Sequence, residues 1–266
     1  MGATRPAAVA GSFYPGDPAA LAAEVASYLA AAPAVARAAL PKAIIAPHAG
    51  YIYSGPIAAS VYARLAPLRA VVRRVVLAGP AHRVYVAGAA IPSVHAFASP
   101  LGPVALDRAA LETLAKLPFV EVSDRAHAEE HSLEVHLPFL QSVFDDFKLV
   151  PVVVGDAAPA EMAALFDALW GGEETLVVVS SDLSHYMPYR SAQDRDARTA
   201  QAIVDLEARL APDEACGAAP INGLLRAARR HGLSAELVDL RNSGDTAGDR
   251  NRVVGYGAFA FVESHG

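Results

Sequence analysis

The chain has 266 residues, of which 53% are hydrophobic and 19% are charged, and its formal net charge is -6. This composition supplies a sizeable core for one large domain and argues against intrinsic disorder. An acidic chain does not offer the basic face that nucleic-acid binding requires, so we expect no nucleic-acid partner.

Short β-branched runs alternate with longer helical patterns along the first half of the chain. Asp17-Pro18 predicts the start of a helix, because aspartate caps a first turn and proline is favoured at its first position. Asp107 predicts a second capped helix. The other elements expected there are strands at 43–46, 74–79 and 86–91 and a helix at 56–65.

The second half continues the same alternation. Residues 129–144 are helical in character, but Pro138 should interrupt the helix because proline lacks the amide donor. The remaining elements expected are strands at 149–154, 176–180, 237–240 and 253–261 and helices at 196–210 and 221–231.

Strands that alternate with helices predict an α/β fold. We expect three layers, α/β/α, around a central mixed and largely parallel sheet. The runs 149–154 and 176–180 are almost continuously apolar, as in strands covered on both faces. Because we find no repeat, linker or shift in composition, we expect residues 1–266 to form a single domain.

The single cysteine, Cys216, excludes a disulfide framework and a cysteine-rich structural zinc site. Residues 1–15 do not resemble a signal peptide, and no apolar run reaches the roughly 18 residues of a membrane span. We therefore expect a cytoplasmic protein in a reducing compartment, with no membrane partner.

Polar side chains follow three of the expected strands. His48 comes after 43–46, His82 comes after 74–79, and 180–185 carries serines, Asp182 and His185 directly after a buried strand. Ligands of open α/β sheets bind beyond the carboxyl ends of strands. Because imidazole is a common metal ligand, the pattern predicts a shared polar pocket that holds a metal, although structural histidines remain the alternative.

The segment 129–136 allows two interpretations. His131 and Glu134 are three residues apart and would share one helix face, but their spacing is not that of an HExxH zinc motif. The segment is either the solvated start of an amphipathic helix or a set of side chains that orient metal-binding histidines.

Motifs of other enzyme classes are absent from the sequence. It contains no GxGxxG after a strand, no P-loop and no GxSxG nucleophile elbow. Ser180 or Ser181 with His185 as base remains a minor alternative. A metal-dependent hydrolase also stays open, because histidines and carboxylates suit zinc-assisted hydrolysis.

Several motifs together resemble one family. They are AGSFYP at 10–15, APHAGYIYSG at 46–55, GPAH at 79–82, EEHSLEVHLP at 129–138, SDLSHY at 181–186, CG at 216–217 and PI at 220–221. The resemblance is to the MEMO family (mediator of ErbB-driven cell motility), whose bacterial and archaeal branch is called AmmeMemoRadiSam system protein B. It covers essentially the whole chain.

The resemblance implies a fold like that of the class III extradiol, LigB-type dioxygenases. By this resemblance His48 and His82 match the two metal histidines. His185 matches the acid/base histidine, with Asp182 beside it. To the pocket or to the side chains that support it we assign Tyr51, Glu130, His131, Ser181, Thr246 and Cys216.

The third metal ligand departs from the family pattern. Animal members use a cysteine in the C-terminal segment, where this chain has Thr246. The neighbouring Asp245 offers a hard carboxylate oxygen and would complete a two-histidine, one-carboxylate site. Alternatively, Asp245 caps a turn and the site has only two strong protein ligands.

The resemblance also implies a function. We expect a divalent metal, Fe(II) first and copper or zinc as alternatives, in an oxidoreductase similar to the extradiol dioxygenases. The substrate is not identified by the sequence; a small molecule or a peptide would occupy the pocket. The alternative is a non-catalytic binding or adaptor protein that acts with AMMECR-type and radical-SAM partners.

Overall fold

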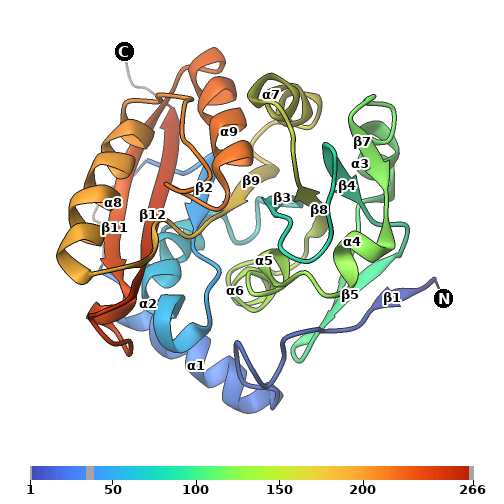
Figure 1. Cartoon of the computed structure of the whole chain (residues 1–266). Coiled ribbons are helices and arrows are strands. Elements are labelled where there is room, and N and C mark those ends of the chain that lie inside the picture. Colours follow the sequence, from blue (N-terminus) through green and yellow to red (C-terminus); the bar gives the residue numbers. More distant parts are fainter. Residues whose placement is uncertain (1, 34–38, 264–266) are drawn as a thin grey trace.

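A nine-stranded mixed sheet forms the centre of the molecule, which the computed structural model describes for residues 2–33 and 39–263 (Figure 1). Its order is β10-β12-β2-β9-β3-β8-β4-β7, and β11 pairs with β12. The strands are β2 (Ala43–Ala46), β3 (Arg74–Pro80), β4 (Ala89–Ile91), β7 (Val120–Val122), β8 (Lys148–Val154), β9 (Thr175–Ser180), β10 (His185–Met187), β11 (Leu233–Asn242) and β12 (Val253–Glu263).

The middle of this sheet is parallel. β2, β9, β3 and β8 are neighbours that run in one direction, whereas β12 is antiparallel to β2 and β4 is antiparallel to β8. The carboxyl ends of β2, β9 and β3 therefore meet at one edge of the sheet. The expected α/β class with a mixed, largely parallel sheet is confirmed.

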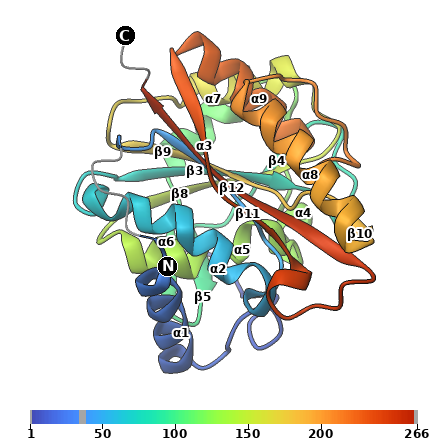
Figure 2. The same ribbon diagram turned by 90° about the vertical axis from the view of Figure 1, so that its left-hand side faces the viewer.

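Helices cover both faces of the sheet, and Figure 2 shows α2 and α6 on one side and α8 and α9 on the other. The first layer holds α1 (Pro18–Ala31), α2 (Tyr51–Tyr62), η1 (Ala63–Leu68), α5 (His131–Glu134) and α6 (Leu137–Val143). The second holds α7 (Pro159–Ala168), α8 (Tyr189–Val204) and α9 (Ala218–Arg230). Within the described ranges, no helix has the length and apolarity that a membrane crossing needs.

A second, three-stranded sheet was not predicted. It pairs β1 (Thr4–Arg5) with β5 (Ala96–Ser99) and β5 with β6 (Gly102–Ala105). The remaining elements are α3 (Arg108–Leu114), α4 (Asp124–Ala128) and η2 (Ser243–Asp245). The two-residue strand β1 could not be recognised from the local sequence, because its partner β5 is far away along the chain.

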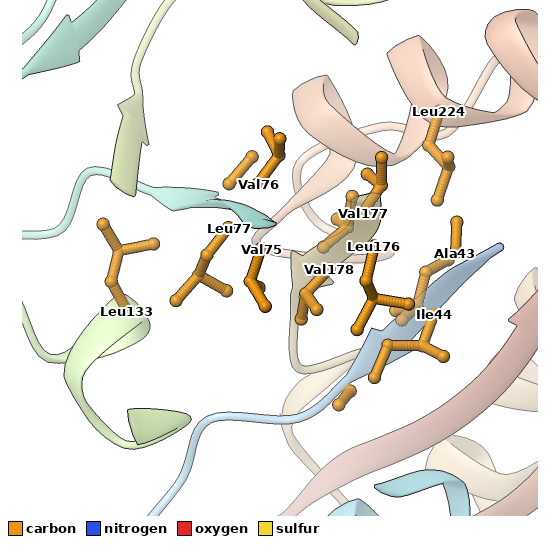
Figure 3. Packing of buried hydrophobic residues seen from close by; sticks show 14 of the residues in the cluster. Ala43, Ile44, Val75, Val76, Leu77, Leu133, Leu176, Val177, Val178 and Leu224 are labelled. Carbon is orange, nitrogen blue, oxygen red and sulfur yellow. The ribbon is translucent and has the colours of Figure 1, made fainter. Parts of the chain in front are cut away.

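The core lies on both faces of the central strands (Figure 3). Val76 of β3 points to the side of Leu224 in α9, whereas Val75 and Leu77 point to the opposite face, where Leu133 of α5 lies. All of these side chains are buried, and each contributes about 1.5–3 kcal/mol by leaving water. Two covered faces explain why these strands show no polar alternation.

The expected helix starts are confirmed where a side chain caps the helix. Asp17 and Asp107 accept hydrogen bonds from backbone amides three residues further on. The helix expected over 129–144 divides into α5 and α6, with Pro138 in the first turn of α6, as predicted.

Other bounds were wrong, most clearly for α8. The expected helix at 196–210 begins instead at Tyr189, and Asp196 lies inside it, buried and bonded to Ser184. The helix ends at Val204 because Leu206 takes a left-handed φ of 55°. Strand 237–240 extends to the bounds of β11, and 86–91 shortens to those of β4.

Two histidines lie in the core as neutral groups. Burial lowers the pKa of His127 to about 4 and that of His136 to about 3. The Nδ1 atom of His136 lies 2.9 Å from the hydroxyl of Tyr62. Both side chains are therefore neutral at pH 7, and protonation of either one lowers the stability of the folded protein.

We expect His136 to make the protein less stable in mild acid. Below pH 6.5 the unfolded chain binds a proton that the native His136 does not, so stability falls with pH, by up to about 1.4 kcal/mol per pH unit for one proton, until about pH 3. We expect urea unfolding of metal-free protein between pH 7 and 4.5 to show that the free energy of unfolding depends less steeply on pH in His136→Phe than in the wild type. His95→Phe, at an exposed position, is the control; equal slopes for wild type and His136→Phe would contradict this assignment.

Candidate metal centre

His48 is buried just beyond β2, at the carboxyl edge of the parallel strands. Its backbone amide donates to Asp182 Oδ1 at 2.8 Å, and its Nδ1 lies 2.7 Å from Ser180 Oγ. The Ser180 hydroxyl donates its single proton to the carbonyl oxygen of Ser132, so it must accept from Nδ1–H of His48. The lone pair of His48 is therefore on Nε2.

His82 follows β3 and is oriented by Glu130, which caps α5. Its backbone amide donates to Glu130 Oε2 at 2.6 Å, and its Nδ1 lies 2.9 Å from Oε1. Burial opposes the charge on Glu130, but hydrogen bonds from His82 and Ser132 outweigh it and lower the pKa of Glu130 to about 2. An ionised carboxylate accepts from Nδ1–H, which leaves the lone pair of His82 on Nε2.

His131 is the first residue of α5 and completes the group from the helical layer. Its ring stacks on His82 with 4.6 Å between centroids and packs at 4.8 Å from the ring of Phe13. Within the described part of the chain its Nδ1 is buried without a hydrogen-bond partner. Burial lowers the pKa of His131, and it lowers that of His48 further, so both imidazoles are neutral.

These three histidines form one group that could hold a metal ion. Each offers a ring nitrogen, and these nitrogens all lie within 4.8 Å of one another. His48 is buried, His131 is half-buried and His82 reaches solvent. Neutral imidazoles with free lone pairs are ligands for first-row transition metals, so the arrangement can hold a metal ion with one side open.

Asp182 and Cys216 flank His48. Asp182 Oδ2 lies 3.9 Å and Cys216 Sγ lies 3.4 Å from His48 Nε2. Burial raises the pKa of the Asp182 carboxyl, and it raises that of the Cys216 thiol to about 12. The cysteine is therefore a protonated neighbour of the histidine.

A pocket of about 560 Å³ opens above the histidines. His185, the exposed first residue of β10, lines it together with Asp182. The remaining lining residues are Phe13, His48, Ala49, Gly50, Tyr53, His82, His131, Tyr186, Ser243, Gly248, Asp249, Arg252, Val254 and Tyr256. The sheet edge thus brings together the histidines that follow three separate strands.

Asp245 and Thr246 form hydrogen bonds at the η2 turn. Its carboxylate accepts from the backbone amide of Asn242 at 3.0 Å and from the hydroxyl of Tyr189, and so caps the η2 turn. The hydroxyl of Thr246 donates to the carbonyl oxygen of Ser243 at 3.2 Å. Neither residue belongs to the three-histidine group found among the described residues, and the hydrogen bonds are those of a turn cap.

Two other residues predicted to support the pocket, Tyr51 and Ser181, are buried and hydrogen-bonded. Tyr51 is buried, and its hydroxyl donates to the carbonyl oxygen of Val135 at 2.6 Å. The Ser181 hydroxyl accepts from the amide of Gly217 and donates to the carbonyl oxygen of Asp182. Ser181 is fully buried in these contacts, which does not suit a nucleophile.

The solvated interpretation of 129–136 was wrong. Glu134 is fully buried and accepts hydrogen bonds from Arg5, from Tyr14 and from the amides of Ala8 and Val9. Arg5 also donates to the carbonyl oxygen of Glu130 at 2.8 Å. Glu134 thus attaches the N-terminal segment to α5, which carries His131 of the three-histidine group.

Sequence reasoning did not identify the aromatic and charged rim of the pocket. Phe13, Tyr53, Tyr186 and Arg252 all line it, from four separate parts of the chain. Phe13, Tyr53 and Tyr186 lie within the motifs AGSFYP, APHAGYIYSG and SDLSHY quoted above, whereas Arg252 lies outside all of them. Pattern could not place them, because their proximity depends on how distant segments pack.

Comparison with known proteins identifies related sequences along nearly the whole chain. The model of the Memo-like protein family matches residues 5–260. A MEMO1 family protein of Methanosarcina barkeri is 37% identical over 96% of this chain and 98% of its own length. A MEMO1 family protein of Aquifex aeolicus is 36% identical over 84% of this chain and 86% of its own length.

Among solved structures, an uncharacterized protein from Escherichia coli K12 shares the fold. It aligns with a TM-score of 0.51 at 14% identity and covers 82% of this chain and 98% of its own. This likeness concerns the fold alone, because fold does not imply function.

Proposed function

Because this chain belongs to the Memo-like protein family, we propose that its three-histidine pocket is the mononuclear metal centre of an oxidoreductase acting on a small molecule. Membership of a family does not identify a reaction, so we infer the function from the residues of the site. The observation that carries it is the convergence of ring nitrogens from His48, His82 and His131 at the floor of an open pocket.

The donor set fits a first-row metal. The Nδ1 atoms of His48 and His82 are held by Ser180 and Glu130, so both Nε2 atoms carry the lone pair that can bind a metal. At His48 the metal would replace the contact with the Cys216 thiol. We assign the third ligand position to His131 in place of the expected Asp245. We expect Fe(II), with copper or zinc as alternatives, because imidazole suits all three.

The side chains of the pocket divide the work around this centre. A bound Fe(II) or copper ion would supply redox chemistry with oxygen and substrate at its open positions. Glu130 and Ser180 fix the orientation of the ligands, and Asp182 holds the backbone of His48. His185 is exposed on the pocket wall, and we assign it the transfer of a proton between substrate and solvent.

A metal-dependent hydrolase is the second candidate. Three neutral imidazoles with an open position are the donor set of one class of catalytic zinc sites, and no carboxylate is needed there. The finding that favours it is His131 in place of a carboxylate ligand. Zinc would then activate water for attack on the substrate, and oxygen would not be required.

Metal analysis of protein purified without oxygen tests the proposal. We expect about one iron per wild-type chain and loss of it in His48→Ala/His82→Ala, as each lost ligand weakens a metal site. Nitric oxide, a stand-in for oxygen, should give the paramagnetic signal of an open Fe(II) site only in the wild type.

Other outcomes identify the alternatives. Zinc without iron, and hydrolysis that persists without oxygen, would favour the hydrolase. Wild-type protein that holds no metal even after reconstitution would contradict both metal-dependent functions. The remaining candidate would then be a binding protein acting with AMMECR-type and radical-SAM partners.

A further inference from the structure

Arg252 presents an unpaired positive charge to the pocket. It is exposed, and it belongs to the pocket lining. Its guanidinium carbon lies 5.1 Å from the centre of the Tyr186 ring. Within the described ranges it forms no ion pair with a carboxylate, unlike Arg241, which pairs with Asp239. The charge is thus available to a ligand.

The partner ring is placed by an irregular piece of backbone. Tyr186 has a φ of 58°, a conformation that residues with a side chain rarely adopt. It lies between His185 and Met187, where the pairing of β10 with β12 shifts register. Bulges of this kind re-aim side chains beside active sites, and their strain persists only where the surrounding structure imposes it. The contact between Tyr186 and Arg252 is therefore built into the sheet edge.

The carboxylates nearest the pocket are engaged with their own neighbours. Asp249 accepts from the amide of Asn251 at 2.7 Å and from its side chain at 3.1 Å. Asp182 accepts from the amide of His48, and Glu130 accepts from His82. A guanidinium that packs one face on a ring keeps the N–H groups of its edge free for a bidentate carboxylate.

The rest of the pocket wall suits a flat molecule. Phe13, Tyr53, Tyr186 and Tyr256 line it, and the volume of about 560 Å³ is in the range of small-molecule sites. Phe13 also packs on His131, so this aromatic wall continues to the metal-binding group.

We propose that the pocket takes a small planar carboxylate, with Arg252 binding the carboxylate group and the aromatic wall holding the planar body. This inference rests on the proposed function, because it names the substrate class of the same site. Arg252 is then a specificity-determining residue: it selects anions over neutral molecules of the same shape.

Binding of 2-naphthoate and of the neutral 2-naphthamide, measured by calorimetry with metal-loaded and metal-free protein, tests this assignment. We expect 2-naphthoate to bind the wild type more tightly than the amide, and Arg252→Met to weaken 2-naphthoate by about tenfold without affecting the amide. Arg252→Lys should restore part of the loss. The matched control is Arg250→Met, because Arg250 packs on Tyr189 and bonds to Gly244.

Other results would overturn the inference. Equal affinity for 2-naphthoate and 2-naphthamide would show that the ligand's negative charge is not recognised. An equal loss of 2-naphthoate affinity in Arg250→Met would show that the effect is not specific to Arg252. Inorganic phosphate binding as tightly as 2-naphthoate would exclude a planar ligand. Elemental analysis tests the metal centre separately. If no metal is found, Arg252-dependent binding of 2-naphthoate to the metal-free protein would still support this inference.

Discussion

Replacing His131 with alanine is expected to weaken metal binding by more than about 100-fold, because losing a ligand costs more than the 10–100-fold typical of losing an outer partner. Asp245→Ala should leave metal affinity unchanged, since the Asp245 carboxylate bonds to Asn242 and Tyr189. The opposite result would be expected from a two-histidine, one-carboxylate site. These two variants therefore decide which residue supplies the third ligand.

Competition against a chromophoric chelator measures this difference directly, with Zn²⁺ in air and Fe(II) without oxygen. Circular dichroism and thermal unfolding of both metal-free variants show that they are folded. If His131→Ala binds metal like the wild type while Asp245→Ala does not, His131 is a pocket wall and the carboxylate is the ligand. Loss in both variants would mean that the η2 turn positions the site indirectly.

Replacing Glu134 with glutamine is expected to lower the free energy of unfolding by about 3–5 kcal/mol, the usual cost of removing one partner of a buried ion pair. Arg5 and Glu134 are 4% and 0% exposed at their side chains, with 2.6 Å between Nη1 and Oε2. Glutamine keeps the shape but loses the charge, so the Arg5 guanidinium stays buried without its counter-ion. Glutamine has one oxygen in place of two, so one of the amides of Ala8 and Val9 also loses its acceptor.

Urea unfolding of the metal-free protein measures this cost. Asp145→Asn is the matched control: Asp145 pairs with Arg69 at the surface, where both side chains are about half exposed, and such pairs contribute about 0–1 kcal/mol. Arg5→Met combined with Glu134→Gln should lose less than the sum of the single variants, because the unpaired charge is gone. Equal costs for Glu134→Gln and Asp145→Asn would show that the buried pair is not a major support of the fold.

The sequence by itself determined the class of the fold. The strands β3, β8 and β9 are continuous apolar runs, and such runs are recognisable because burial on both faces leaves no polar alternation. Capped helix starts at Asp17 and Asp107 were recognisable for a local reason, since the cap bonds to amides within the next turn. The bounds of α8 could not be recognised in the sequence, because Asp196 in the helix interior accepts a hydrogen bond from Ser184, which lies outside the helix.

The position of His48 and His82 was also readable, because each follows a strand, and the carboxyl ends of neighbouring parallel strands meet. Spacing could not show which third group joins them. His131 comes from a four-residue helix in the covering layer, and it reaches the sheet edge only because α5 packs against β3 and β8.

Only the tertiary structure decided the rest of the site. Asp245 was plausible as a ligand by residue type, but local hydrogen bonds turn it into a cap. The sequence left open whether the segment of Glu134 is solvated or supports the site, and the structure surrounds Glu134 with four donors from the N-terminal segment. Arg252 and Tyr186 meet through a bulge between strands. The contacts of Glu134 and of Arg252 depend on packing between segments distant in sequence, and no local pattern encodes them.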